Sequence, residues 1–253
     1  MSEQGVENNV QARYSEGAQE RQEALCCPVD YDVSLLKLLP TEIVEKDYGC
    51  GDPSRYVKTS DTVLDLGSGG GKICYMAAQI VGAEGRVIGV DMTDDMLALA
   101  RKYQSEMAEK IGGNRVEFHK GYIQDLALDV QAMEVWLAEN PVKDIEGLQA
   151  LETWKSQQKN ESPLIKSDSV DLVISNCVLN LVAQKDRQQM IAEIFRVLKP
   201  GGRVAISDIV CDERVPEHLQ NDPTLWSGCI SGAFHEKGFL DAFVVQTKTN
   251  RPA

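Results

Sequence analysis

A glycine-rich segment flanked by carboxylates offers the first recognisable chemistry. The segment 65–71, Asp-Leu-Gly-Ser-Gly-Gly-Gly, follows a β-type run, and Asp91 ends the next such run. Glycines permit a sharp strand-to-helix turn and let a ligand approach the backbone, while a carboxylate beyond the second strand can accept hydrogen bonds from both ribose hydroxyls. This order of elements predicts a nucleotide-binding site. Its candidate residues are Asp65, Gly67, Ser68, Gly69, Gly71 and Asp91.

The acidic residue ahead of the glycines indicates which kind of nucleotide is bound. A dinucleotide-binding fold usually begins Gly-x-Gly-x-x-Gly and places helix amides on a pyrophosphate. Here Asp65 precedes the first glycine by two positions. Because a carboxylate attracts positive charge and repels phosphate, the segment favours a cationic ligand over a diphosphate.

Seven cysteines offer a second kind of chemistry. The stretch 1–23 has neither a positive leader nor an apolar core of signal-peptide length. No later apolar run approaches the roughly 20 residues of a membrane span. We therefore expect a cytoplasmic protein with no membrane partner, whose free thiols serve metal, redox or catalytic roles. Zinc is disfavoured, since no Cys-x-x-Cys occurs and no histidine is spaced with a cysteine in a zinc pattern.

Composition sets the class of protein and its partners. The chain has 253 residues, 43% of them hydrophobic and 26% charged, which is close to the globular average. Lysine and arginine total 26 against 39 aspartates and glutamates, for a formal net charge of -13. A nucleic-acid partner is disfavoured, because such binding depends on neutralising phosphates and no basic run offsets the acidic balance. We expect one compact domain with an arm or an insertion, and a monomer.

The elements that must position these residues are short β-branched runs that alternate with helical segments. That alternation is typical of βαβ units, so we predict an α/β fold with a mostly parallel sheet flanked by helices. The predicted strands are 62–66, 86–90, 115–119, 169–175 and 203–208, and the predicted helices between them are 71–81, 93–111 and 184–198.

Two further segments lie outside this alternation. Val10, Tyr14 and Ala18 recur at helical spacing and predict an N-terminal amphipathic helix that packs on the body. Residues 129–166 contain helix formers but no strand character, and predict a helical insertion that is a solvated cover or an active-site lid. The chain then divides into an N-terminal helical arm with a cysteine-containing cover (1–58), a ligand-binding core with the insertion (59–210) and a short C-terminal segment (211–253).

The segment 65–71, taken with Leu-Lys-Pro-Gly-Gly at 198–202, resembles the class I S-adenosylmethionine-dependent methyltransferases. The resemblance implies a Rossmann-like fold in which Asp65 and the glycine turn bind around the methionine part of the cofactor and Asp91 holds the ribose. It also implies an adenine pocket in the segment after the third strand, with Ile123 packing on the ring. Many members carry an acid where Gln124 stands, and an amide can still pair with the adenine edge.

Three separated cysteine motifs narrow the resemblance. The sequences Tyr-Gly-Cys-Gly at 48–51, Ser-Asn-Cys at 175–177 and Ser-Gly-Cys-Ile-Ser-Gly at 227–232 closely resemble the arsenite methyltransferase family, as does Val-Asp-Met-Thr at 90–93. The similarity extends from about residue 14 to residue 234. Composition and spacing alone do not indicate arsenic as the substrate.

The resemblance implies that the protein methylates trivalent arsenic from S-adenosylmethionine. The implied arsenic ligands are Cys50, Cys177 and Cys229, with Cys27 as a further candidate. Tyr48, Met92 and Asn176 join the implied cofactor contacts. A thiol reductant of the thioredoxin or glutathione type is implied as well, with cysteine disulfides forming between turnovers.

The chemistry of the residues agrees with this implication. Trivalent arsenic is a soft thiophile, so three thiolates from distant loops could hold it with its lone pair free. The oriented lone pair could then attack the sulfonium methyl in line, with proximity and alignment as the main source of catalysis. The remaining cysteines fit this scheme less well, since Cys74 lies among helical core residues and Cys211 belongs to no motif.

Two other functions stay open. In one, the methyl acceptor is an unrelated small organic molecule and the cysteines are incidental. In the other, the chain is a non-catalytic binder of a metalloid or of the cofactor. The second is favoured by a departure from the family, whose members typically continue well past the third cysteine motif, whereas 24 residues follow Cys229 here.

Overall fold

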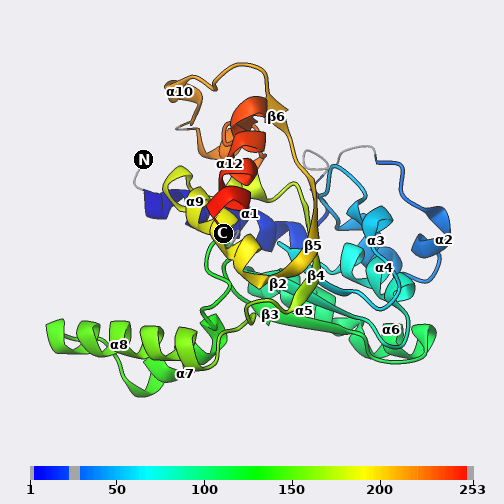
Figure 1. The fold of residues 1–253 in the computed structure, drawn as a ribbon, viewed down its shortest axis with the longest axis horizontal. Helices are drawn as coiled ribbons and strands as arrows, with labels where there is room; N and C mark the ends of the chain where they lie inside the picture. Colours follow the sequence, from blue (N-terminus) through cyan, green and yellow to red (C-terminus); the bar gives the residue numbers. More distant parts are fainter. Residues whose placement is uncertain (1–2, 23–28, 221, 250–253) are drawn as a thin grey trace.

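A five-stranded parallel sheet lies at the centre of the molecule (Figure 1). The computed structural model describes residues 3–22, 29–220 and 222–249. The strand order is β3-β2-β1-β4-β5, so the chain begins in the middle, moves to one edge and then crosses to the other half. The strands are β1 Thr62–Leu66, β2 Arg86–Asp91, β3 Val116–Lys120, β4 Val170–Asn176 and β5 Leu198–Ser207.

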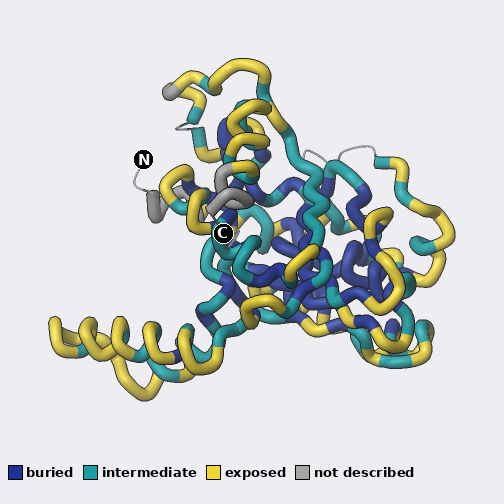
Figure 2. The backbone as a smooth tube through the Cα atoms, viewed as in Figure 1, coloured by how far each residue is buried: buried dark blue, intermediate teal, exposed yellow. Residues whose placement is uncertain are grey.

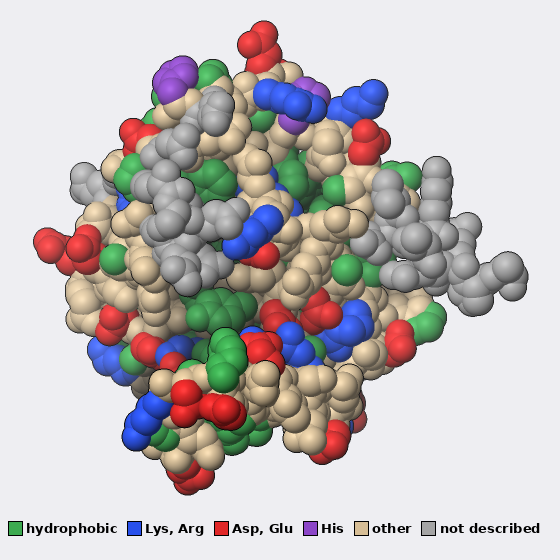
Figure 3. All heavy atoms as spheres, turned by 90° about the vertical axis from the view of Figure 1, so that its left-hand side faces the viewer, with side chains coloured by type: hydrophobic (Ala, Val, Ile, Leu, Met, Phe, Trp, Pro, Cys, Tyr) green, Lys and Arg blue, Asp and Glu red, His purple; other side chains and the backbone are tan. Residues whose placement is uncertain are grey.

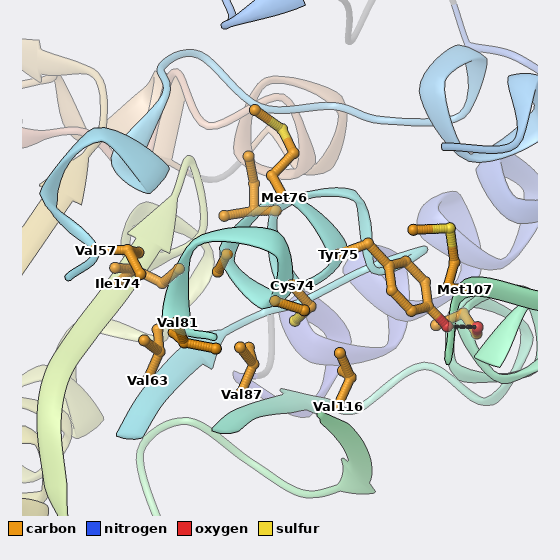
Figure 4. Close-up of a cluster of buried hydrophobic side chains, with 14 of the residues drawn as sticks. Val57, Val63, Cys74, Tyr75, Met76, Val81, Val87, Met107, Val116 and Ile174 are labelled. Atoms are coloured by element: carbon orange, nitrogen blue, oxygen red, sulfur yellow. Dashed lines mark hydrogen bonds between the residues drawn. The ribbon is translucent and has the colours of Figure 1, made fainter. Parts of the chain in front are cut away.

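Helices cover both faces of this sheet and form a separate hydrophobic core on each. One face is covered by α4 Lys72–Val81, α5 Asp94–Lys102 and α6 Gln104–Ile111. The other face packs against α9 Arg187–Val197 and α12 Glu236–Thr249. Burial on both faces explains why the central strands are almost continuous runs of apolar residues. The tube in Figure 2 is dark blue through this centre, and Figure 4 shows α4 packed on the first face.

The N-terminal helix α1, Glu3–Gln19, packs against the body as its apolar spacing predicts. Val10 and Ala18 are buried, and α1 lies against α5 and α11 Pro223–Ser227. Arg13 fastens the contact by donating Nη1 to the carbonyl of Thr224 at 2.8 Å. The cover that follows contains α2 Val33–Leu36, α3 Thr41–Glu45 and a 3₁₀ turn, η2 Pro53–Tyr56.

The predicted insertion is a helical hairpin of α7 Val130–Glu139 and α8 Ile145–Glu161. Asp129 and Asp144 cap the two helices by accepting hydrogen bonds from the amides of Ala132 and Gly147. The hairpin projects from the body and is largely exposed (Figures 1 and 2). It therefore differs from the cover over the sheet that the sequence predicts. Acidic and basic side chains are interspersed over the face of the molecule on this side (Figure 3).

The C-terminal segment folds back onto the main body. A two-stranded parallel ribbon joins β6 Val210–Cys211 to β7 Phe234–His235, with α10 Glu217–Gln220 and α11 between them. Two short 3₁₀ turns, η3 Leu179–Leu181 and η4 Gln184–Asp186, connect β4 to α9. Within the described ranges, no helix is both long enough and apolar enough to cross a membrane.

Three predicted elements differ from the structure by more than a residue at one boundary or in continuity. The helix predicted at 93–111 is two helices, because the chain leaves helical geometry at Tyr103, whose hydroxyl contacts Glu42 of α3. The helix predicted at 184–198 begins as a 3₁₀ turn and becomes α-helical at Arg187. β5 starts at Leu198 instead of residue 203, and its register against β4 shifts there to accommodate the glycines.

Candidate active site

A cavity lies beyond the carboxyl ends of β1, β2 and β4, where ligands of open parallel sheets bind. The chain segments that follow these strands line it, together with α1 and the loop after α3. Of the residues predicted from the sequence, the cavity is lined by Tyr48, Asp65, Gly67, Ser68, Gly69, Asp91, Met92, Ile123, Gln124, Asn176 and Cys177. The predicted cofactor contacts are therefore brought together, apart from Gly71.

The glycine turn after β1 is fixed by the neighbouring strand. The amides of Gly67 and Ser68 both donate to the carbonyl of Val90, at 2.8 and 3.1 Å. Gly67 has φ +70°, and a Cβ there would lie 2.5 Å from Val178, so both backbone conformation and close approach require glycine. Gly71 begins α4 away from the cavity, and its missing side chain makes room for Phe118, 2.8 Å from the position a Cβ would take. Its role is helix–sheet packing.

Asp91 is the carboxylate at the end of β2. Its Oδ2 accepts the amide of Gly69 at 2.9 Å, and its Oδ1 accepts the amide of Thr93 at 2.8 Å. Burial raises the pKa of Asp91, and these backbone donors oppose that rise. Each carboxylate oxygen has further lone pairs, so the residue can also accept from a pair of ligand hydroxyls at the cavity wall.

Asp65 is the second buried carboxylate of the cavity. It is 2% exposed at the end of β1, and its Oδ2 lies 3.2 Å from the Cys74 thiol. Burial raises the pKa of Asp65 to about 7, and the nearby charges of Asp47 and Asp91 act in the same direction. A cationic ligand would favour the ionised form of this carboxyl and bind to it.

One buried polar atom at the cavity has no internal partner. Ser68 lines the cavity, and its hydroxyl, which is buried against Gly89 of β2, makes no hydrogen bond to any described residue. Buried hydroxyls are normally paired, so an unpaired one beside a cavity points to a ligand group. Together with the carboxylates it fits a ligand that is cationic and carries hydroxyl groups.

The far end of the cavity suits a flat apolar group. Ile123 and Gln124 lie in the turn after β3, where Tyr122 and Asp125 form an isolated bridge. Met92 and Met96 line the cavity as well. An adenine ring could pack between these apolar side chains, with the Gln124 amide at its edge.

Asn176 ends β4 and links the cavity to the first cysteine motif. Its Oδ1 accepts the amides of Cys50 and Gly51, both at 2.9 Å, and its Nδ2 donates to the carbonyl of Gly51 at 2.8 Å. A Cβ on Gly49 would lie 2.0 Å from Nδ2, so only glycine lets the loop approach this closely.

The three cysteines of the motifs meet beside the cavity. Cys50 and Cys177 form a disulfide across a sequence separation of 127 residues, so the expectation of free thiols is wrong for this pair. Cys229 is buried, and its thiol donates to the carbonyl of Cys177 at 3.0 Å. Val10, Tyr14 and Met92 pack in the same hydrophobic cluster. Cys177 and Cys229 have φ of +59° and +63°, a strained backbone that the surrounding contacts must hold.

The Cys229 segment is held in place by a buried polar network. Asn180 is fully buried and donates Nδ2 to Asp208 and to the Ile209 carbonyl, both at 2.7 Å. Arg187 donates to the carbonyls of Asn180 and Gly232 at 3.2 and 2.6 Å. Burial of Asp208 raises its pKa to about 6. Because the network joins η3, the segment after β5, α9 and the C-terminal segment, it fixes Cys229 relative to Cys177.

Residues outside the predicted set complete the site. Asp47 lines the cavity, receives Lys72 Nζ at 2.8 Å and accepts the hydroxyl of Tyr31 at 3.1 Å. Lys72 lies 3.3 Å from the centre of the Tyr31 ring, a cation–π contact. The sequence signal for the Asp47–Lys72 ion pair is an acid just before the Tyr48 motif and a base just after the glycine turn. The candidate ligand Cys27 lies outside the described residues.

The fold and the site define an S-adenosylmethionine-type methyltransferase domain, and the chain belongs to the methyltransferase-domain family, whose sequence profile matches residues 58–151 and 155–248. The predicted Rossmann-like fold class is confirmed. This fold supports S-adenosylmethionine as the methyl donor, and the carboxylates of Asp65 and Asp91 at the cavity fit that cation.

Comparison with individual proteins shows which kind of methyltransferase the chain is similar to. The chain is 36% identical over 205 residues to the arsenite methyltransferase of Aquipseudomonas alcaligenes, covering 81% of this chain and 49% of that protein. It is 40% identical over 187 residues to that of Halobacterium salinarum, covering 73% of this chain and 37% of the relative. The crystal structure of CrArsM, an arsenic(III) S-adenosylmethionine methyltransferase from Chlamydomonas reinhardtii, matches with a TM-score of 0.66 and 30% identity, covering 88% of this chain and 64% of that one. The chain thus spans about half the length, or less, of the curated relatives it matches. The resemblance drawn from the motifs is confirmed.

Proposed function

We propose that this chain methylates trivalent arsenic, held by the thiolates of Cys50, Cys177 and Cys229, with S-adenosylmethionine as the methyl donor. The observation that carries the proposal is the convergence of these three cysteines, from three chain segments, beside a cavity that suits a cation. The named activity of the relatives supports it.

The Cys50–Cys177 disulfide must be reduced before these cysteines can bind arsenic. A dithiol of the thioredoxin type, or glutathione, would supply the two electrons and two protons that convert Cys50–Cys177 into two thiols. Each of the three thiols then replaces a hydroxyl group of arsenous acid, so that an As–S bond forms and the thiol proton leaves in water. The cytoplasm keeps thiols reduced and is where we place the protein, acting as a monomer on a small metalloid.

The methyl step depends on alignment. When bound, S-adenosylmethionine supplies a methyl group on a cationic sulfonium, which the lone pair of the thiolate-held arsenic can take up. Asp65, Asp91 and Ser68 would fix the donor, and Cys177 lies at the wall between donor and metalloid. Such alignment can raise effective concentrations to about 10⁵ M or more. Methyl transfer breaks the bond between the methyl group and the sulfonium, which leaves as the neutral thioether S-adenosylhomocysteine, and formally converts arsenic to the pentavalent state. Formation of the Cys50–Cys177 S–S bond would then break their two As–S bonds and return two electrons to arsenic, while water supplies a hydroxide to the methylarsenic(III) left on Cys229 and releases a proton.

The test is methyl transfer from labelled S-adenosylmethionine to sodium arsenite in the presence of thiol. We expect methylarsenicals from the wild type, and a loss of at least about 100-fold in Cys50→Ser and Cys177→Ser, since removing one ligand breaks the alignment. Cys211→Ser is the matched control, because its thiol contacts the carbonyls of Ala233 and Phe234 away from the cluster.

Other results would point elsewhere. Tight binding of S-adenosylmethionine without an arsenic product would contradict the proposal and favour a non-catalytic binder. Methylation of an organic acceptor that survives both Cys50→Ser and Cys177→Ser would favour a small-molecule methyltransferase in which the cysteines are incidental.

A further inference from the structure

A thiol with no part in the proposed chemistry lies directly behind the cofactor cavity. Cys74 is in the first turn of α4, fully buried in the core between the helix and the sheet (Figure 4). It is too far inside the core to meet a metalloid and forms no disulfide. Its sequence context indicates an ordinary core residue.

The contact of this thiol is not apolar. Cys74 Sγ lies 3.2 Å from Asp65 Oδ2. Among the described residues, Cys74 is the one hydrogen-bond donor to Asp65, although the carboxyl group is almost completely buried. A buried carboxylate without a cation beside it needs such a donor to stay in place and stay charged.

Acidic neighbours make this single donor important for the ionisation of Asp65. The charged groups that face Asp65 are Asp47, from the loop after α3, and Asp91, from the end of β2, and both are acidic. They oppose ionisation of Asp65, whereas the hydrogen bond from Cys74 on α4 favours it. Lys72, on the same helix as Cys74, is directed to Asp47 instead.

We propose that Cys74 is a positioning residue for cofactor binding, which holds Asp65 from the core side and presents its carboxylate to the cationic part of the ligand. The inference rests on the proposed function only in taking S-adenosylmethionine as that ligand, and does not depend on arsenic. Cys74 itself touches neither reactant.

The experiment is calorimetric titration of the full chain with S-adenosylmethionine at several pH values between 6 and 9. Cys74→Ala and Cys74→Val remove the donor, while Cys74→Ser keeps one. We expect roughly 10-fold weaker binding at pH 7 in the two donor-free variants, and a change of less than about threefold in the serine variant, since hydrogen bonds to charged groups have about this strength. Two donor-free variants are used in case one does not fold, and circular dichroism identifies the folded one.

The pH profile separates positioning from general damage to the core. Binding of a cation tightens as Asp65 ionises, so loss of the thiol donor moves that rise to higher pH. The ligand's own amino group titrates equally in all variants and cancels in the comparison. Equal weakening at every pH, or wild-type binding by a folded donor-free variant, would overturn the inference. Wild type that binds S-adenosylmethionine but makes no arsenic product would contradict the proposed function alone.

Discussion

The side chain of Asn176 holds the backbone of Cys50 from across the site: its Oδ1 accepts the Cys50 amide at 2.9 Å, while the neighbouring residue Cys177 bonds the Cys50 sulfur. The loop before η2 is therefore tied to the end of β4 twice, once reversibly by redox chemistry and once by the three hydrogen bonds of the Asn176 side chain. These hydrogen bonds remain when the disulfide is reduced.

Asn176→Ala should loosen this loop in the reduced protein. Three hydrogen bonds are lost, so we expect the unfolding free energy to fall by about 1–3 kcal/mol. We also expect a smaller fraction of Cys50–Cys177 disulfide after mild oxidation, measured by peptide mapping. Asn176→Asp keeps the acceptor and serves as the comparison. An unchanged disulfide fraction in the alanine variant would contradict the role given to Asn176.

Asp65→Asn should stabilise the protein without ligand while impairing cofactor binding. The pKa of Asp65 is about 7 when folded and near 3.8 when unfolded. Between these values the folded chain binds more protons, so stability falls as pH rises through that window. Removing the carboxyl should recover up to about 4 kcal/mol at pH 8, from roughly three pKa units.

The measurement is urea unfolding of both proteins at pH 5 and pH 8. The gain should be about 1–2 kcal/mol at pH 5, because that pH already lies above the pKa of the unfolded carboxyl, and about 4 kcal/mol at pH 8. Some decline between these pH values should remain in the variant, because burial raises the pKa of Asp91 and Asp208 as well. Equal gains at the two pH values would show that Asp65 is not the group responsible.

Tyr14→Phe should make Cys229 less reactive. The Tyr14 hydroxyl is hydrogen-bonded to the Cys229 sulfur, and burial keeps the pKa of Tyr14 well above its usual value, so the hydroxyl remains a donor. A donor stabilises the thiolate. We expect several-fold slower alkylation of Cys229 by iodoacetamide near pH 7.5 and slower uptake of arsenite. Tyr56→Phe, at an exposed tyrosine, is the control, and faster alkylation in Tyr14→Phe would refute the assignment.

Arg187→Met should release the third cysteine from the other two. The guanidinium joins three carbonyl groups and stacks on the Phe234 ring at 4.1 Å. We expect a loss of about 2–4 kcal/mol in unfolding free energy and weaker binding of arsenite, since buried acceptors lose their partner. Cofactor affinity, measured by calorimetry, should stay within about threefold, because Arg187 does not line the cavity. Loss of both affinities together would indicate general unfolding.

The sequence predicted the parts of this fold that local pattern determines. β1 has the predicted bounds, and β2, β3 and β4 differ by a residue, because β-branched apolar runs bounded by turns specify buried strands. The start of β5 was missed because Lys199 to Gly202 looks like a helix stop, yet the β4–β5 register accommodates it. The break at Tyr103 depends on a contact with α3, which no local pattern records.

The site, like the fold, has features that the local sequence predicts and others that arise only from tertiary packing. Strand ends and glycines predicted that Asp65, the glycine turn and Asp91 meet at one site, because parallel topology brings strand ends together. The further lining residues Tyr48, Met92, Ile123 and Gln124 were implied by the family resemblance. The disulfide between Cys50 and Cys177, the Asn180–Arg187 network and the Cys74–Asp65 contact arise from tertiary packing. Cys74 and Asp65 are nine residues apart in the sequence, and this spacing does not by itself predict a contact. They meet only because a strand, a turn and a helix fold together.

The hairpin of α7 and α8 leaves and rejoins the body at one place. The amides of Leu164 and Ile165 donate to the carbonyls of Ala127 and Leu126, both at 2.9 Å, so the two ends of the excursion are bonded side by side. A short turn could join them without disturbing β3 or β4. The hairpin is thus a modular appendage whose outer part is free to diverge in length and sequence, or to be replaced by a reporter, while its base stays paired with the carboxyl end of β3 through the Lys159–Asp125 and Glu134–Lys120 ion pairs.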